Sequence, residues 1–179
     1  MKSLRVMLCA LPLALTGCST MSAVNWSAAY PWNWFGASTE VTEQGVGKLT
    51  ASTPLNEQAI SDALGKGNIV HYFEALKNNS VALTINGDNG AISRVDVRDA
   101  DIKTASGVKI GTPFSDLYSK AFGNCQKGSH DNGAVVECQA EGSQHISYAF
   151  TGHWSGPDEL MPSDDTLKNW KVSKIIWRR

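Results

Sequence analysis

The chain contains four cysteines and four histidines, the residue types best suited to nucleophilic, redox or metal chemistry. They are Cys9, Cys18, Cys125, Cys138, His71, His130, His145 and His153. The histidines are scattered, and none forms a His-Glu-x-x-His motif or a Cys/His cluster of the zinc-binding kind. No Gly-x-Ser-x-Gly elbow and no Cys-x-x-Cys pair is present. The sequence therefore predicts no catalytic residue, no metal site and no cofactor.

Aspartates in the middle of the chain offer a weaker candidate for cation binding. Asp96, Asp99 and Asp101 lack the spacing and the glycine of an EF-hand loop. Arg94 and Arg98 alternate with them. We interpret this segment as a solvent-exposed charged face rather than as a cation site.

A second acidic group falls in the predicted long loop at residues 152–170. We interpret it as a surface run or, alternatively, as half of a carboxylate pair that would work with His145 or His153. His71 lies in a strand-like run, Ile69 to Leu76, and is interpreted as structural. The loop carboxylates are Asp158, Glu159, Asp164 and Asp165.

Cys18 ends the tetrapeptide Leu15-Thr16-Gly17-Cys18, which follows Lys2, Arg5 and an apolar run from Val6. A basic start, a short apolar run and small residues at its end describe a secretory signal. A membrane-spanning helix would need about 20 apolar residues. The tetrapeptide looks like the lipobox of a bacterial lipoprotein, cut before Cys18, which then carries the lipid, palmitate included. We predict a signal peptide at residues 1–17; the alternative is a secreted protein cleaved near Ala23.

Lipidation would make the membrane the first partner of this chain, because two or more acyl chains give stable anchoring. Resemblance to lipoproteins also implies a sorting rule, in which aspartate after the cysteine retains the protein in the inner membrane. Ser19 occupies that position here. We therefore predict a lipid-anchored protein of the outer membrane that faces the periplasm.

Residues 18–179 have the length of one domain. Loss of Lys2 and Arg5 leaves 14 Lys and Arg against 17 Asp and Glu, a balance that argues against nucleic acid as a partner. Cys125 and Cys138 would remain unmodified in an oxidising compartment, so we predict a disulfide between them. The oligomeric state is not predicted.

Residues 18–40 are predicted to be a tether rich in tryptophan, without a charged residue before Glu40. Three interpretations remain open: aromatic side chains that fold back onto the domain, a segment at the lipid headgroup layer, where Trp and Tyr are favoured, or a patch that docks a partner. The aromatic residues are Trp26, Tyr30, Trp32, Trp34 and Phe35.

The remaining residues, 41–179, contain an apparent internal duplication. Thr53-Pro54-Leu55 has a counterpart 59 positions later in Thr112-Pro113-Phe114, and Gly45 to Leu49 has one 62 positions later in Gly107 to Gly111. Ile92 to Val97 resembles Val172 to Trp177 in the same way. We predict two pseudo-repeats, at roughly 41–101 and 102–179, each a strand, a helix and several strands.

Each repeat is predicted to contain one short helix that begins with a Thr N-cap followed by Pro. In the first, Thr53 is the cap and the helix runs to Leu64. In the second, Thr112 is the cap and the helix ends at Phe122-Gly123. The inward residues are predicted to be Leu55, Ala59, Ile60, Ala63 and Leu64 in the first helix, and Phe114, Leu117, Tyr118, Ala121 and Phe122 in the second.

Runs rich in β-formers predict the strands. Val81 to Ile85 and Ala91 to Val97 flank a strong turn signal at 86–90. Cys125 and Cys138 flank Asp131-Asn132-Gly133, which predicts a hairpin closed by the disulfide. Further strands are predicted at 146–151 and 172–177. The fold class is α+β: an antiparallel sheet with two short helices packed on it.

Basic residues are concentrated at the C-terminal end. One interpretation is an amphipathic strand, with Ser173, Ile175 and Trp177 opposite to Val172, Lys174, Ile176 and Arg178, whose basic end pairs with the acidic loop. The other is a patch for anionic groups, such as lipid phosphates or an acidic protein. The patch consists of Lys168, Lys171, Lys174, Arg178 and Arg179.

Three segments carry a family resemblance: residues 25–35 (Asn-Trp followed by Pro-Trp-Asn-Trp-Phe), residues 107–125, and residues 161–179. In these three segments the chain resembles the enterobacterial sigma-E (RpoE)-regulated lipoprotein family. The resemblance implies an envelope-stress lipoprotein of uncharacterised role and supplies no catalytic residue. The chain is shorter than the family pattern between Leu64 and Ile69.

Two functional hypotheses follow. The first is a non-enzymatic outer-membrane lipoprotein that binds a partner or ligand, or serves assembly, during envelope stress. The second is a periplasmic hydrolase, or an inhibitor of one, that acts on cell-envelope material through the loop carboxylates and a histidine. Such catalysis requires acid and base groups that reach one substrate.

Overall fold

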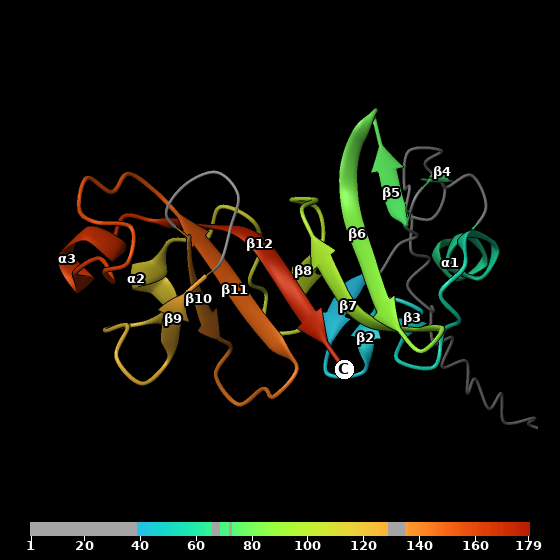
Figure 1. Cartoon of the computed structure of the whole chain (residues 1–179), viewed down its shortest axis with the longest axis horizontal. Helices are drawn as coiled ribbons and strands as arrows, with labels where there is room; N and C mark the ends of the chain where they lie inside the picture. The colour runs from blue at the N-terminus through green and yellow to red at the C-terminus, as the bar shows by residue number, and fades with distance from the viewer. Residues whose placement is uncertain (1–38, 66–68, 72, 129–134) are drawn as a thin grey trace, which may run out of the picture.

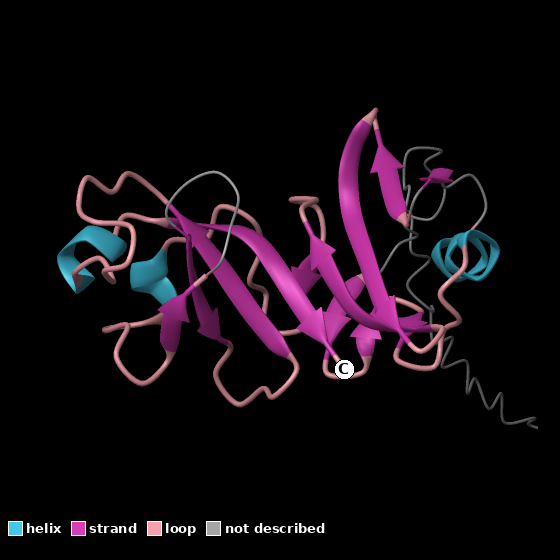
Figure 2. Cartoon of the chain, viewed as in Figure 1, coloured by secondary structure: helices cyan, strands magenta, loops and turns pink. Residues whose placement is uncertain are grey.

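The computed structural model describes residues 39–65, 69–71, 73–128 and 135–179 (Figures 1 and 2). The predicted signal peptide and all but the end of the predicted tether therefore lie outside the described residues. Within the described residues the fold is mostly β, with three short helices. The predicted antiparallel sheet with short helices is present, but helix is a smaller part of the fold than the predicted α+β class implied. Propensity and pattern overestimated helix because tertiary contacts end the second helix after one turn.

The strands form two sheets. The small mixed sheet has the order β3-β2-β1-β8 and the large sheet has the order β4-β5-β6-β7-β12-β11-β10-β9, antiparallel throughout. The small sheet contains β1 (Glu40–Thr42), β2 (Gly45–Val46), β3 (Leu49–Thr50) and β8 (Lys103–Thr104). The large sheet contains β4 (Ile69–His71), β5 (Glu74–Lys77), β6 (Ser80–Asp88), β7 (Ala91–Val97), β9 (Cys125–Lys127), β10 (Val135–Gln139), β11 (Ile146–Thr151) and β12 (Lys171–Arg178).

The large sheet is built from two four-stranded meanders that meet at their last strands, β7 and β12. Their register is symmetric, because Val97 pairs with Ile175 while Val95 pairs with Trp177. The same hydrogen bonds recur in both halves: Leu55 N–H donates to Gly90 O, and Phe114 N–H donates to Trp170 O. The repeated segments that the sequence identified therefore occupy matching places in the two halves.

A Thr-Pro segment precedes each of the first two helices and ties it to the last strand of its meander. Pro54 bridges to Ala91 and Pro113 bridges to Lys171. The predicted N-caps are therefore wrong: the bridges are formed by Pro54 and Pro113, and neither Thr53 nor Thr112 caps a helix. Their hydroxyls accept hydrogen bonds from the N–H groups three residues earlier instead, at 3.0 and 3.2 Å.

The helices differ in length from the predicted ones. Helix α1 (Glu57–Leu64) begins after Asn56, whose side chain caps it by accepting from Ala59 N–H. Helix α2 (Phe114–Leu117) ends at Tyr118, whose backbone is extended. Phe122, predicted to face inward, is 86% exposed. A third helix, α3 (Asp164–Leu167), lies within the segment predicted to be a loop.

The hydrophobic core lies between one face of the large sheet and a second layer formed by the small sheet and the helices. Val46 of β2, Ile60 of α1 and Phe114 of α2 pack into the same cluster as Leu83 and Trp177 of the large sheet. The Trp177 indole also donates a hydrogen bond to Glu43 O, which joins the two sheets. Charged side chains consequently gather on the other face of the large sheet.

The side chains of β12 do not alternate as predicted along the whole strand, because the strand contains a β-bulge. The register with β11 shifts between Ala149 and Phe150: Ala149 pairs with Lys174, but Phe150 pairs with Val172. The extra residue, Ser173, places Val172 in the core cluster together with Ile175 and Trp177. From Lys174 onward the predicted alternation holds.

Both predicted hairpins are present. β6 and β7 turn at Asn89 and Gly90, both with positive φ, as a two-residue type I′ turn requires. β9 and β10 form the other hairpin, in which Cys125 and Cys138 face each other and form the predicted disulfide. The turn residues of that hairpin, 129–134, lie outside the described residues.

Candidate functional site

The charged face of the large sheet carries three cations that share two carboxylates. Arg94 of β7 contacts Asp96 through Nε and Nη2, at 2.6 and 3.1 Å, and Lys174 of β12 reaches the same carboxylate at 3.0 Å. Arg178 of β12 contacts both oxygens of Glu137 on β10, at 2.5 and 3.0 Å. We call these five residues the cationic platform.

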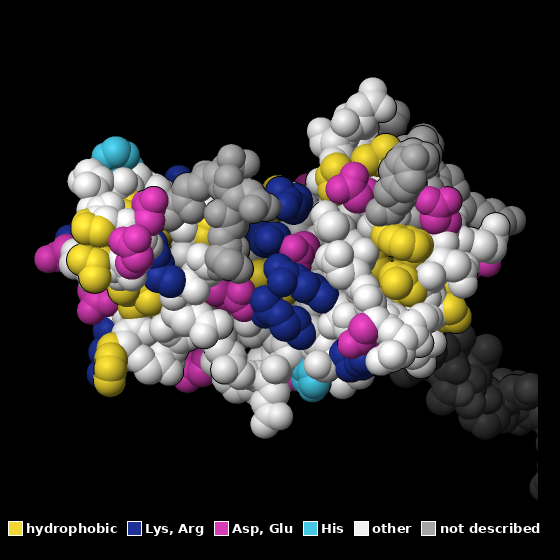
Figure 3. Space-filling model, viewed as in Figure 1, with side chains coloured by type: hydrophobic (Ala, Val, Ile, Leu, Met, Phe, Trp, Pro, Cys, Tyr) yellow, Lys and Arg dark blue, Asp and Glu magenta, His cyan; other side chains and the backbone are white. Residues whose placement is uncertain are grey.

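The platform has its cations outermost and its carboxylates beneath. The side chains of Asp96 and Glu137 are 8% and 15% exposed, whereas those of Arg94 and Arg178 are 34% and 37% exposed. Figure 3 shows the result as Lys and Arg side chains gathered at the centre of this face, over β12 and β7. The surface therefore presents positive charge although the ions are paired.

The cations retain hydrogen-bond donors that the carboxylates do not use. Arginine has five N–H donors and the lysine ammonium has three. Arg94 uses two nitrogens on Asp96, and Lys174 makes one bond to it. The remaining N–H groups suit an added oxyanion with several acceptor oxygens.

The charges of the platform are fixed by their neighbours. The hydrogen bonds from Arg94 to Asp96 raise the pKa of Arg94, outweighing burial, which lowers it. Burial acts to raise the pKa of Glu137, but Arg178, the Ser147 hydroxyl and Arg94 together hold this pKa below its ordinary value. Both groups are therefore charged at neutral pH.

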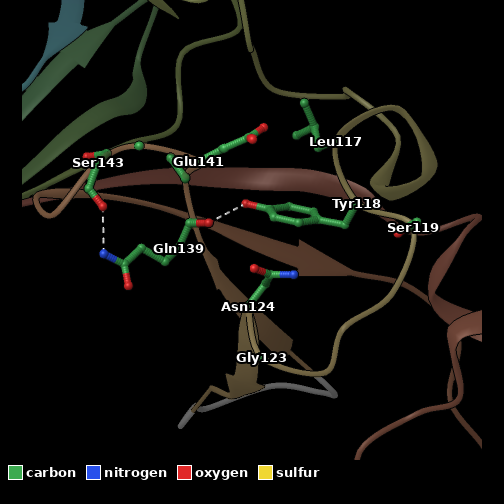
Figure 4. A pocket seen from close by; sticks show the side chains of 10 residues that line it. Leu117, Tyr118, Ser119, Gly123, Asn124, Gln139, Glu141 and Ser143 are labelled. Atoms are coloured by element: carbon green, nitrogen blue, oxygen red, sulfur yellow. Dashed lines mark hydrogen bonds between the residues drawn. The ribbon is translucent and has the colours of Figure 1, made fainter.

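A polar trough adjoins the platform and consists of two hollows. The first, of about 410 Å³, lies between residues 117–124, which run from the last residue of α2, and the β10–β11 turn (Figure 4). Tyr118 lies across it and donates to Gln139 O at 2.7 Å, and the Gln139 amide donates to Ser143 O at 2.6 Å. Burial raises the pKa of Tyr118, so its hydroxyl remains a donor.

The second hollow, of about 630 Å³, connects the first one to the platform. It shares Gly123, Asn124 and Gln139 with the first and also includes Glu137 and Arg178. Three further polar side chains complete its wall from β9, the β10–β11 turn and β11. They are Gln126, Gln144 and Ser147.

The five residues of the predicted anionic-partner patch do not form one cluster. Lys174 and Arg178 belong to the platform, and Arg179 pairs with Asp88. Lys168 pairs with Asp165, as the interpretation with the acidic loop predicted, while Lys171 is exposed at the other end of β12. Three of the five therefore pair with acids on other strands of the large sheet rather than with the loop.

The structure also places the other candidate acids. Asp96 is 6% exposed, so the prediction of a solvent-exposed face is wrong for this residue. Asp99 and Asp101 both pair with Lys77; the Asp99 side chain is also only 8% exposed, so the prediction holds for Asp101 but not for Asp99. Among the described residues no group of three or more His, Cys, Asp or Glu is arranged to hold a metal ion.

His145 and the carboxylates of α3 lie beyond opposite ends of β11. The His145 ring contacts Arg178 O just before β11 begins, and α3 lies beyond the other end of that strand. At about 3.4 Å per residue, the six residues of β11 alone separate these positions by roughly 17 Å. Asp164 accepts a hydrogen bond from Ala121 N–H, a structural role. His153 is exposed after β11, and His71 contributes backbone pairing to β4. Neither hollow of the trough is lined by any of these residues.

Comparison with known proteins identifies the family. Residues 23–179 match the family described as "Protein of unknown function (DUF1131)". The chain belongs to this DUF1131 family. It is 70% identical to the "Uncharacterized protein YfeY" of Escherichia coli (strain K12), over the whole of both chains. The aligned length is 191 positions against 179 residues here, so that relative carries additional residues.

A solved structure also matches this DUF1131 chain. The crystal structure of the uncharacterized protein yfeY from Escherichia coli has a TM-score of 0.70 and 67% sequence identity; the match covers 79% of this chain and 100% of that one. Within the described part of the chain, no helix is long and apolar enough to cross a membrane. Cys18 lies outside the described residues.

Lys174 and Arg178 were predicted from the sequence, but their pairing with Asp96 and Glu137 was not. Lys174 and Asp96 are 78 positions apart and meet only through the pairing of β7 with β12. The alternation of Arg94 and Asp96 on one strand was the one available signal. For the trough there was no signal, because its polar residues come from separate turns.

Proposed function

We propose that this DUF1131 member is an outer-membrane lipoprotein of the envelope stress response, anchored through Cys18, with a binding role rather than an enzymatic one. The lipobox-like tetrapeptide supports the anchor, and the Cys125–Cys138 disulfide supports an oxidising compartment. The resemblance to sigma-E-regulated lipoproteins supports the stress response. The separation of His145 from the α3 carboxylates supports binding over hydrolysis.

The cationic platform is the observation that carries the binding role. The partly exposed Arg94, Lys174 and Arg178 lie above two more shielded carboxylates and keep unused donors, which favours an anionic group at this face. We infer that the platform, rather than the C-terminal basic cluster as a whole, contacts the anionic partner. Lys171 and Lys168 lie at the far end of β12 and are not assigned to it.

The anchor can be tested by following palmitate incorporation and membrane fractionation of the full chain expressed in a bacterial envelope. We expect Cys18→Ser to lose the label and to leave the outer-membrane fraction. Cys9→Ser, a change within the same predicted signal, should retain both. Equal labelling and fractionation of the two variants would overturn the anchor. Ser19→Asp should shift the protein toward the inner membrane.

The platform can be tested by titrating the detergent-purified protein with inorganic phosphate and following side-chain NMR signals. We expect Lys174→Gln to weaken phosphate binding at least several-fold and Lys174→Arg to restore most of it. Lys48→Gln, a change at an exposed lysine between β2 and β3, should leave binding unchanged. Equal binding by all variants, or no binding by the wild type, would overturn the platform's role.

The matching halves also support the predicted duplication of a strand-helix-strands unit. Thr53, Pro54 and Leu55 in the first half and Thr112, Pro113 and Phe114 in the second make corresponding bonds to β7 and β12. Two meanders then join by their last strands. We infer that a gene for one unit was duplicated and that the second copy acquired the trough.

A further inference from the structure

The trough and the cationic platform form one continuous polar surface. Arg178 belongs to both, because it lines the second hollow and lies opposite Arg94 in the pairing of β12 with β7. The two hollows share Gly123, Asn124 and Gln139. A ligand that occupies the trough can therefore place one end on the platform without crossing a barrier of side chains.

The trough itself is suited to uncharged hydroxyl groups. Asn124, Gln126 and Gln144 are exposed, and within the described residues their side chains make no hydrogen bond. Each amide offers both donors and an acceptor. A sugar ring presents neighbouring hydroxyls that donate and accept together, which is the complementary pattern. Leu117 and Tyr118 add an apolar wall for the C–H face of a ring (Figure 4).

The charges along this surface give the ligand a direction. Glu141 lines the first hollow, and neither hollow contains a lysine. An anionic group is therefore repelled at the far end of the trough and attracted at the platform. Each hollow has the size of a small-molecule site, so the surface accommodates more than one ring.

We propose that this surface binds a phosphorylated oligosaccharide, with the phosphate on Arg94, Lys174 and Arg178 and the sugar rings in the trough. The proposal rests on the proposed function in that it uses the same cationic platform. Tetrahedral phosphate offers several acceptor oxygens to the unused N–H groups, and the side-chain amides of the trough hydrogen-bond to the sugar hydroxyls. Such a ligand exists both as a free sugar phosphate and as the headgroup of a lipid.

The test compares trehalose phosphate, trehalose and inorganic phosphate by calorimetry on the detergent-purified full chain. We expect trehalose phosphate to bind at least tenfold more tightly than inorganic phosphate. The triple variant Asn124→Ala, Gln126→Ala, Gln144→Ala should remove that advantage and leave phosphate binding intact. Gln44→Ala, at an exposed amide between β1 and β2, is the matched control.

The outcomes separate the two proposals. If trehalose phosphate and phosphate bind equally and the triple variant changes neither, the saccharide site is overturned and the platform stands. If neither ligand binds, both are overturned. Competition by polyglutamate as strong as that by trehalose phosphate would assign the face to an acidic polypeptide and overturn the saccharide. Circular dichroism of each variant checks that it is folded.

A vesicle assay distinguishes the two sources of the ligand. Co-sedimentation with vesicles that contain phosphatidylinositol phosphate, but not with phosphatidylglycerol vesicles, would support a lipid headgroup. Binding of trehalose phosphate without discrimination between the vesicles would support a free sugar phosphate. For this arm Cys18→Ser protein is used, so that an acyl anchor does not itself attach the protein to the vesicle.

Discussion

The two halves of the large sheet share their framework and differ at their outer ends. In both, a Thr-Pro segment ties the start of a helix to the last strand of a four-stranded meander. In the first half, α1 has eight residues and packs beside β4. In the second half, α2 has four residues and is followed by a non-helical segment that lines the trough.

This difference shows where the fold tolerates change. The shared bonds lie at the centre, where β7 and β12 join the meanders, and the core packs against both strands. The outer ends carry what is specific to each half: a full helix in the first, and a disulfide, a shortened helix and a trough in the second. We infer that the symmetric centre supplies stability and that the second half supplies the ligand site.

The largest expected effect concerns the first residue after each Thr-Pro segment. Phe114 is 1% exposed and contacts the rings of Tyr118 and Phe150, whereas its counterpart Leu55 is only partly buried. We expect Phe114→Ala to lower the free energy of unfolding by about 3–5 kcal/mol and Leu55→Ala by about 1–2 kcal/mol. Urea denaturation measures both.

Phe122→Ala serves as the control, because that side chain is 86% exposed and should contribute almost nothing to stability. Equal losses for Phe114→Ala and Leu55→Ala would contradict the view that the second half depends more on this position than the first does.

The next effect concerns the disulfide, which only the second half has among the described residues. The Cys125→Ala, Cys138→Ala double variant should lose about 3 kcal/mol of stability, because the crosslink restricts the unfolded chain. Hydrogen exchange should show faster opening of β9 and β10, with β4 and β5 unchanged. Faster opening of both outer hairpins alike would mean that the crosslink stabilises the whole sheet and not its own half.

The elements that local chemistry determines were predicted best. The β6–β7 hairpin follows from Asn89 and Gly90, which adopt positive φ with little strain, and the disulfide follows from the count of cysteines. The repeated Thr-Pro segments were also visible in the sequence, although their role was not: two matching segments were interpreted as helix caps, and both lie in strand bridges.

The features that depend on contacts distant in sequence were not predictable. An apolar stripe continues to Phe122, yet α2 stops at Leu117 because the Tyr118 hydroxyl bonds to Gln139 O and Asp164 holds Ala121 N–H. Periodicity cannot reveal such competitors. The trough exists only because that helix stops. Neither the helix end nor the trough could therefore be predicted from the sequence, because both depend on contacts between distant residues.

A smaller effect should separate the halves by pH. Glu137 of the second half has a lowered pKa, so its pairing with Arg178 stabilises the folded state above the ordinary value of 4.5 and is lost as pH falls below it. Lys77 of the first half has a pKa raised above 10.5, although burial acts to lower it, because it bonds to Asp101 and Asp99. Its contribution is present below 10.5 and is lost as pH rises through the raised value.

Thermal unfolding across pH tests this pair of charges. Glu137→Gln should flatten the acid side of the stability profile and leave the alkaline side unchanged, whereas Lys77→Met should do the reverse. Each change should amount to about 1 kcal/mol, since one member of each pair is partly exposed. If either variant altered both limbs equally, the effect would be a general loss of packing rather than titration of the named group.

The smallest effect tests the equivalence of the halves most directly. Thr53 and Thr112 each accept a hydrogen bond from the N–H three residues earlier, and each carbonyl accepts one from the last strand of its meander. Replacing either by Val keeps the size and the carbonyl but removes the hydroxyl acceptor. We expect each change to cost about 0.5–1 kcal/mol, and the double variant to show the sum, because the two sites share no partner. Urea denaturation measures the two costs. Equal costs are expected if one ancestral unit still folds in the same way at both ends of the sheet. Markedly unequal costs would mean that the two hydrogen bonds have the same geometry but do not stabilise their halves equally.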